Sequence, residues 1–203
     1  AVSRTPRSRN ALILCFAAIA LLTVADLGSK HWALERLSRA PIGQSRPACE
    51  PSVNGRIPPQ RLSTRPIVLI DGYLEFRYAE NCGAAFGFMR EGPALFRKGV
   101  FYVAAVGAVL LLLFMFAGGR GGSLFAWSVP LIVAGAIGNL VDRIRLGYVV
   151  DFVRFHLHDR WAYPTFNVAD VWITAGVILI LLDGFRETRR ERLEAQQASR
   201  AEA

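Results

Sequence analysis

The sequence predicts a mainly α-helical integral membrane protein with four transmembrane helices. Of its 203 residues, 53% are hydrophobic, more than in an average soluble domain. The apolar residues are grouped into runs, and the longest runs match the ~20 residues that a helix needs to cross a bilayer. The helices are predicted at about 11–31, 97–117, 122–142 and 167–186, within a single membrane-embedded domain.

The two central runs are the clearest of the four. Gly99–Gly119 and Gly121–Val141 contain no charged residue, and each is long enough to span the apolar core of a membrane. The last run, Val171–Leu182, is shorter. It reaches a sufficient length if its helix begins near Asn167.

The first run, Ala11–Ala25, allows two interpretations. A basic leader and a short apolar stretch are also typical of a cleaved signal peptide. No small-x-small cleavage site ends the run, however, and Lys30, His31 and Trp32 follow it. Such residues are typical of an anchor at the membrane interface, so we favour a transmembrane helix.

The formal net charge is +8, and basic residues flank the first and last predicted helices. Basic residues accumulate on the cytoplasmic side of membrane proteins, so we expect both termini to be cytoplasmic. This explanation of the charge makes a nucleic-acid partner unnecessary. The basic residues that flank the first and last helices are Arg4, Arg7, Arg9, Arg186, Arg189, Arg190 and Arg192.

The segment between the first two helices has two parts. The range 40–66 is rich in Pro, Arg, Ser and Gly, which predicts a flexible insertion with no core of its own. The range 67–78 combines an apolar run, Asp71-Gly72 and an alternating pattern, which predicts a β-hairpin. Cys49 and Cys82 both lie in the outer segment, where a disulfide between them is possible. No Cys/His spacing indicates a metal site, and we expect no cofactor.

Polar residues gather at the outer ends of three predicted helices. Ionisable groups near the apolar core of a bilayer are costly and usually face the interior of a helix bundle. Their placement on one side therefore predicts a functional site. The residues are Asp26 on the first helix, Asn139, Asp142 and Arg143 on the third, Asp151 in the outer connection, and Asn167 and Asp170 on the fourth.

Each of these residues also has a structural interpretation. Asp26 can mark a helix end, Asn167 can cap a helix start, and Asp170 can interact with the helix dipole. For Asp142 and Arg143 we favour a buried structural ion pair. Asp151 has no local partner in Val-Val-Asp-Phe-Val, and a structural role leaves it unexplained.

Two carboxylates in one partly dry site share a proton, because the charge of one raises the pKa of the other. The ionised acid can then take a proton from water, while the protonated acid donates one. This is the chemistry of aspartic proteases. Asp151 and Asp170 lie on separate segments, so the fold must bring them together.

Four short blocks resemble the lipoprotein signal peptidase (signal peptidase II) family. The resemblance covers nearly the whole chain except the range 40–66 and the ends. The blocks are ADLGSK from Ala25, NCGAAF from Asn81, GAIGNLVDR from Gly135 followed by VVDF from Val149, and FNVAD from Phe166.

This resemblance implies an aspartyl endopeptidase of the bacterial inner membrane, with its active site toward the periplasm. Such enzymes cut diacylglyceryl-modified prolipoproteins before the lipidated cysteine. The resemblance makes Asp151 and Asp170 the catalytic pair. The residues that it places in support of the pair or in substrate binding are Asp26, Lys30, Asn81, Gly83, Asn139, Asp142, Arg143, Asn167 and Ala169.

The resemblance also implies an extracytoplasmic β-cradle over about 67–90 and a short periplasmic helix at about Phe152–Asp159 that acts as a mobile lid. We expect contact with membrane lipid and a monomeric protein. Position 82 departs from the family, because it is Cys where Thr is common. The insertion is also longer than the family pattern.

Other classes of protein remain as alternatives. A channel or transporter would need polar residues through the middle of the membrane, and Gly99–Gly119 has none. A cation site built from Asp26, Asp142, Asp151 and Asp170 is a second alternative, since hard cations bind carboxylates. The Gly-x-Gly-Asp motif of another class of membrane aspartyl protease is absent from the sequence.

Overall fold

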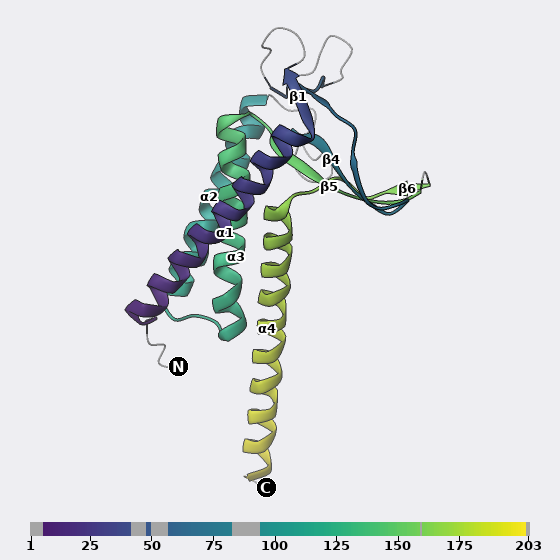
Figure 1. Ribbon diagram of the computed structural model, residues 1–203. Helices are drawn as coiled ribbons and strands as arrows, with labels where there is room; N and C mark the ends of the chain where they lie inside the picture. Colours follow the sequence, from purple (N-terminus) through teal and green to yellow (C-terminus); the bar gives the residue numbers. More distant parts are fainter. Residues whose placement is uncertain (1–5, 42–47, 50–56, 83–93, 159, 202–203) are drawn as a thin grey trace.

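The computed structural model describes residues 6–41, 48–49, 57–82, 94–158 and 160–201. Its helices lie side by side, and both ends of the chain are found at the same end of the helices (Figure 1). A β-sheet lies at the opposite end and extends sideways from the start of the last helix. The four helices are α1 (Arg9–Arg36), α2 (Ala94–Ala117), α3 (Ser123–Arg145) and α4 (Val168–Ala201).

The predicted mainly helical membrane fold is confirmed. Three helical segments, Arg9–Arg36, Ser123–Arg145 and Val168–Arg200, are long and apolar enough to cross a membrane, and Tyr102–Ala117 is a shorter apolar helix. Large apolar side chains such as Leu21 are more than two-thirds exposed. Such exposure suits contact with lipid rather than with water.

Helix α3 is the centre of the helical part, since it packs against α1, α2 and α4. Small residues permit this close packing, as is typical of membrane helices. A side chain at Gly135 would collide with the Ala169 carbonyl of α4, and one at Gly138 would collide with the carboxylate of Asp26 on α1. The helices could not approach this closely with larger residues at either position.

The other end of α3 is held by a buried acid of α4. The N-cap residue Gly122 has no side chain to accept a hydrogen bond, but its backbone N–H donates to Asp183 Oδ2 at 2.7 Å. Arg7 lies nearby and donates to the Gly121 carbonyl. These contacts join three parts of the chain at the end that carries both termini.

The four-stranded sheet is antiparallel, with strand order β3-β4-β5-β6. The predicted hairpin is present: β3 and β4 are joined by a turn in which Gly72 has φ +75°, a conformation that glycine adopts without strain. Strand β5 adds to β4, so two distant parts of the chain meet in one sheet. The strands are β3 (Ile67–Ile70), β4 (Leu74–Asn81), β5 (Val149–Leu157) and β6 (Trp161–Ala162).

The expected short helix at Phe152–Asp159 is wrong for the described part of that range. Val149–Leu157 forms strand β5, which pairs with β4 from Asn81↔Val149 to Leu74↔Phe155. The local pattern agrees with this, because apolar and polar residues alternate from Val153 to Leu157 with the period of a strand. Asp159 lies outside the described residues.

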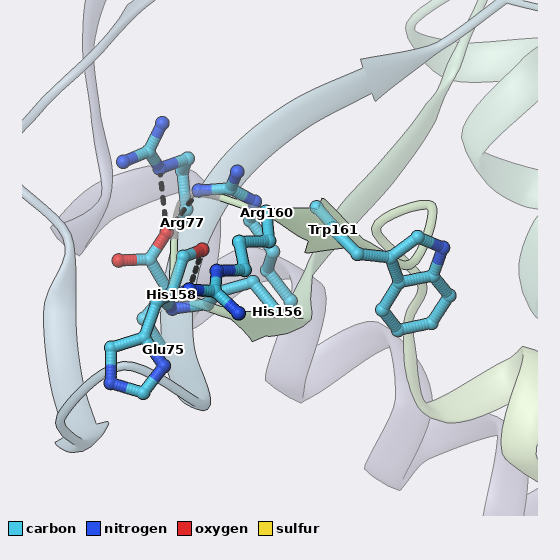
Figure 2. Close-up of a pocket in the computed structure, with 8 residues that line it drawn as sticks. Glu75, Arg77, His156, His158, Arg160 and Trp161 are labelled. Carbon is cyan, nitrogen blue, oxygen red and sulfur yellow. Dashed lines mark hydrogen bonds and ion pairs between the residues drawn. The ribbon is translucent and has the colours of Figure 1, made fainter.

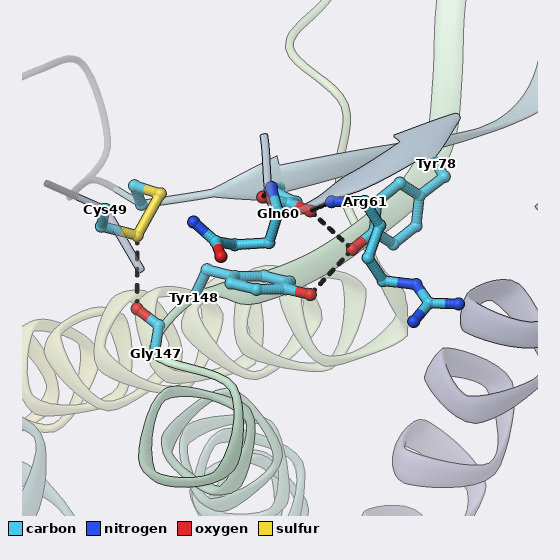
Figure 3. The surroundings of a disulfide bond; sticks show 8 residues. Cys49, Gln60, Arg61, Tyr78, Gly147 and Tyr148 are labelled. Atoms are coloured by element: carbon cyan, nitrogen blue, oxygen red, sulfur yellow. Dashed lines mark hydrogen bonds between the residues drawn. A yellow bond between two sulfur atoms is a disulfide. The ribbon is translucent and has the colours of Figure 1, made fainter. Parts of the chain in front are cut away.

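The described parts of the predicted insertion, range 40–66, are attached to other elements of the fold. Strand β1 (Ser38–Pro41) pairs with β2 (Arg61–Ser63). Cys49 is buried and forms a disulfide with Cys82 (Figure 3). The backbone N–H of Arg61 donates to Glu80. These contacts attach the described parts of the insertion to the end of β4, which the sequence pattern did not indicate.

Candidate active site

Asp151 lies at the third position of β5 and is only 2% exposed. Two asparagine amides donate to its carboxylate: Asn81 Nδ2 to Oδ2 at 3.0 Å and Asn167 Nδ2 to Oδ1 at 2.6 Å. Asn81 ends β4, which pairs with β5, and Asn167 immediately precedes α4. The partners absent from the local sequence of Asp151 therefore come from two other elements.

Asp170 is the third residue of α4 and forms a reciprocal cap with Asn167. Asn167 Oδ1 accepts from the Asp170 N–H, and Asp170 Oδ2 accepts from the Asn167 N–H, both at 3.1 Å. This is the geometry of a capping box, so the predicted capping role of Asn167 is confirmed. Asn139 Nδ2 of α3 donates to the other oxygen of Asp170 at 2.9 Å.

The carboxylates of Asp151 and Asp170 belong to one hydrogen-bonded group, since Asn167 contacts both of them. Burial, and to a smaller extent the charge of Asp170, raise the pKa of Asp151 to about 7. Hydrogen bonds from Asn81 and Asn167 act in the opposite direction, because they favour the ionised form. The arrangement can therefore hold one protonated and one ionised acid near neutral pH.

A second buried group surrounds Lys30 of α1. Its Nζ lies 2.8 Å from Asp26 Oδ2 and 3.5 Å from Asp142 Oδ2, and it donates to Asn139 Oδ1 at 2.8 Å. Lys30 and Asp26 are 2% and 0% exposed. Because its oxygen is bound by Lys30, the Asn139 amide presents its N–H group to Asp170.

Asp26 and Asp142 also fix the backbone beside the two central acids. Asp26 Oδ1 accepts from the Ala169 N–H at 2.8 Å, and Ala169 directly precedes Asp170. Asp142 Oδ2 accepts from the Val150 N–H at 3.0 Å, and Val150 directly precedes Asp151. Each outer acid thus holds the residue before one inner acid.

The predicted Asp142–Arg143 ion pair is wrong. Asp142 pairs with Lys30 instead, and Arg143 Nη1 donates to the Asn139 carbonyl at 3.2 Å. Adjacent helical residues point in different directions, so a pair at i and i+1 is geometrically unfavourable. Arg143 is nonetheless close enough to Asp151 and Asp170 to interact electrostatically with both.

The four acids of the alternative cation site divide into the Lys30 group and the asparagine-linked group. In the part of the chain that the structure describes, no group of three or more His, Cys, Asp or Glu side chains could hold a metal ion. Gly83, predicted to support the site, lies outside the described residues.

Sequence reasoning missed a cluster of three aromatic rings from α1, β4 and β5. Trp32 of α1, Phe76 of β4 and Phe152 of β5 contact one another edge-on, with ring centroids 5.5 to 6.1 Å apart. The alternation around Phe76 places it in the hairpin, but only the pairing of β4 with β5 brings it to Phe152.

The fold is that of a helical membrane enzyme. Two solved structures, both described as bacterial membrane enzymes studied by the in meso method, match it with TM-scores of 0.65 and 0.60 at 20% and 22% identity. The first match covers 91% of this chain and 93% of the other, and the second covers 83% and 90%. At these identities the likeness concerns the fold.

Comparison of the sequence with known proteins identifies the family to which this chain belongs. Residues 18–186 match the family model described as signal peptidase (SPase) II. A lipoprotein signal peptidase of Clostridium tetani is 34% identical over 84% of this chain and 95% of its own length. Another, from Pseudomonas putida, is 40% identical over 62% of this chain and 73% of its own length. The chain belongs to the signal peptidase II family, and the predicted family resemblance is confirmed.

Proposed function

We propose that this member of the family removes signal peptides from diacylglyceryl-modified prolipoproteins, with Asp151 and Asp170 as its catalytic pair. The observation that carries this proposal is the asparagine-linked group, in which Asn167 contacts both carboxylates. Burial of Asp151 and the charge of Asp170 favour a single shared proton. That protonation state is the one an aspartic peptidase needs.

In the proposed reaction, ionised Asp170 takes a proton from a water molecule whose oxygen attacks the scissile carbonyl carbon. Protonated Asp151 donates its proton to the carbonyl oxygen, which gives a neutral tetrahedral intermediate. Collapse of this intermediate breaks the C–N bond, and a proton from Asp170 passes to the leaving amine. Asp151 regains its proton from the intermediate, so both acids return to their starting states.

The surrounding residues would act by positioning the pair. Asn81, Asn139 and Asn167 orient the carboxylates through their amides. Asp26 and Asp142 hold Ala169 and Val150, the residues that precede the catalytic acids. Lys30 forms ion pairs with both outer acids. The orientation needed for catalysis would thus be established before substrate binds.

We further propose that α1, α2, α3 and α4 all cross the bacterial inner membrane, with the termini in the cytoplasm and the sheet in the periplasm. The common position of both termini supports an even number of spans (Figure 1). The site then lies near the membrane surface, where a lipidated cysteine remains while its signal helix stays in the bilayer. The sheet would serve as the substrate cradle, and the working unit would be a monomer.

The test uses purified protein in lipid, with a chelator present. One prolipoprotein is supplied in diacylglyceryl-modified and unmodified forms, and release of the signal peptide is followed by gel and mass spectrometry. We expect cleavage of the modified form alone, immediately before the lipidated cysteine. Equal cleavage of both forms, or cleavage at another bond, would contradict the proposed substrate.

A further inference from the structure

The outer half of the four-stranded sheet carries a basic pocket that the proposed peptide hydrolysis does not use. The pocket has a volume of about 370 Å³. Three arginines and two histidines line it against one carboxylate (Figure 2). The charged and titratable residues of the pocket are Glu75, Arg77, Arg154, His156, His158 and Arg160.

Glu75 holds two of the arginines close together. Its side chain is 7% exposed, and its Oε1 atom forms an ion pair with Arg77 Nε at 2.9 Å and accepts a hydrogen bond from Arg154 Nη1 at 2.7 Å. One carboxylate oxygen therefore fixes two guanidinium groups side by side. A guanidinium has five N–H donors, and among the described residues Glu75 is the only ion-pair partner found for either side chain.

The pocket has an excess of positive charge. Arg77 and Arg154 exceed the single charge of Glu75, and Arg160 adds a third cation that has no ion-pair partner in the described part of the chain. Adjacent guanidinium groups with free N–H donors match the oxygens of a phosphate, because they can bind them in a bidentate way. The chemistry of the pocket is therefore that of a phosphate-binding site.

The pocket is separate from the carboxylate pair. Successive residues of a strand point to opposite faces of a sheet, so Arg154 and His156 face away from Asp151 and Phe155 on the same strand. The Glu75↔Arg154 pairing puts the Glu75 side chain on the pocket face as well. Arg154 is three residues from Asp151, about 10 Å along the strand.

The rim of the pocket is apolar and exposed. Trp161, which lines the pocket, is 59% exposed. Tyr73 is 47% exposed, with its ring 5.2 Å from that of His158. Val68, paired with Glu75 across the sheet, is 55% exposed. Aromatic residues beside cationic ones are typical of the zone where lipid headgroups meet the apolar part of a bilayer.

We propose that this pocket binds the phosphate-bearing headgroup of an anionic membrane phospholipid. The guanidinium groups contact the phosphate, and the apolar rim contacts the adjoining glycerol and acyl chains. A soluble phosphate would leave that rim unused. The diacylglyceryl group of the proposed substrate carries no phosphate, so the charge of the pocket serves a second lipid. The conclusion that this lipid is distinct from the substrate rests on the proposed function, whereas the proposal of a phosphate-binding site does not.

The test measures lipid binding without any peptide substrate. The full-length protein is equilibrated with mixed phosphatidylglycerol and phosphatidylcholine, and the lipids that it retains are quantified by native mass spectrometry. In the variant Arg77→Gln/Arg160→Gln, Glu75 keeps Arg154 as its partner, so no buried charge is left uncompensated. We expect wild-type protein to retain phosphatidylglycerol preferentially and the double variant to lose about tenfold or more of that preference, as for the loss of hydrogen bonds to a charged group.

Arg39→Gln is the matched control, because Arg39 is an exposed arginine of β1 that does not line the pocket. It should retain phosphatidylglycerol like the wild type. Equal retention by the wild type and the double variant would overturn the proposal. Displacement of the lipid by millimolar inorganic phosphate would also overturn it, because that result indicates a site for a free anion. So would a KM for acidic substrates that differs between the double variant and the wild type in purely zwitterionic lipid, because that result indicates a peptide site.

Discussion

Every oxygen of the two central carboxylates accepts a hydrogen bond. Asn81 and Asn167 donate to Asp151, while Asn139 and the Asn167 backbone donate to Asp170. Such bonds favour ionised carboxylates, but burial of Asp151 outweighs them and raises its pKa to about 7. The balance at this one residue determines the pH range in which the pair holds a single proton.

The pH dependence of the peptidase follows from this balance. We expect kcat/KM to decrease as the pH rises through about 7, because Asp151 then loses the proton that it must donate. The folded chain holds this proton more tightly than the unfolded chain, whose Asp pKa is ~3.9. The contribution of Asp151 to stability is therefore greatest below pH ~4 and is lost as the pH rises to about 7.

The variant Asn81→Ala tests whether Asp151 is the origin of the alkaline limb of the pH profile. Removing its amide removes a donor that favours ionised Asp151, so the alkaline limb of the pH profile should move to higher pH. A purely structural effect would lower the rate at every pH without moving the limb. An unmoved limb, or one displaced to lower pH, would contradict the proposed protonation of Asp151.

At this scale the sequence predicted the members of the site better than their partners. The family resemblance of the blocks VVDF and FNVAD selects Asp151 and Asp170 as the pair, because Asp26 and Asp142 also lie beside apolar segments. The partner of Asp142 could not be predicted, because Lys30 comes from another helix and 112 residues separate the two in the sequence. Pairing with the neighbouring Arg143 was the available local interpretation, and the helix geometry excludes it.

Among the elements, α3 determines how closely α1 and α4 approach each other. Gly138 leaves room for the Asp26 carboxylate of α1, and Gly135 leaves room for the Ala169 carbonyl of α4. Both contacts lie beside hydrogen bonds that position the site, because Asp26 accepts from the Ala169 N–H. A single methyl group at this point would displace a buried charge rather than a flexible side chain.

Gly138→Ala should therefore destabilise the protein by roughly 1–3 kcal/mol, the usual cost of overpacking, and reduce activity strongly. Thermal unfolding in detergent and the cleavage assay measure the two effects. Gly107→Ala on α2 is the matched control, since nothing lies within 4 Å of an added Cβ there, and it should behave like the wild type. Equal stability and activity of the two variants would contradict the observed packing.

Strand β5 illustrates what local sequence could and could not predict. Its alternating pattern from Val153 to Leu157 is that of a strand, yet family resemblance led us to expect a helix at Phe152–Asp159. Pairing of β5 with β4 depends on residues about 70 positions away, such as Asn81 opposite Val149. The disulfide likewise joins the insertion to the residue after Asn81, a pairing that the sequence allowed but could not establish without the fold.

This disulfide should stabilise the end of β4 that carries Asn81. We expect Cys49→Ser/Cys82→Ser to lower the free energy of unfolding by about 2–4 kcal/mol and to lower the cleavage rate, since Asn81 donates to Asp151. Unfolding and rate measurements check both effects. The control Cys15→Ser changes the buried free cysteine of α1, far from Asn81 in sequence. A double variant with wild-type stability and rate would contradict a supporting role for the disulfide.

Over the whole molecule, polar groups are concentrated at the two ends of an apolar helical body. One end carries the carboxylate pair and the sheets, while the other carries both termini, Arg7 and Asp183 (Figure 1). The mainly helical membrane fold followed from hydropathy, because the bilayer requires long apolar helices. The order of the strands could not be predicted from hydropathy, because β4 and β5 are neighbours in the sheet but are separated in the sequence by α2 and α3.

The proposed topology predicts which positions can be reached from outside the cell membrane. A cysteine introduced by Arg39→Cys on β1 should react with an impermeant maleimide in intact spheroplasts. A cysteine introduced by Arg189→Cys, which follows the apolar part of α4, should react only after permeabilisation, since it lies on the basic cytoplasmic side. The reverse pattern, or labelling of both in intact spheroplasts, would contradict the proposed orientation.

The most direct test of the central claim measures signal-peptide release by Asp151→Asn and Asp170→Asn under single-turnover conditions. Asp183→Asn is the matched control, because it alters a buried acid of the same membrane helix 13 positions after Asp170, beside Gly122. We predict that each of the first two variants remains folded and loses at least about a thousandfold in rate, while the control cleaves normally. Near wild-type release by a folded Asp151→Asn or Asp170→Asn protein would contradict the assignment of the catalytic pair.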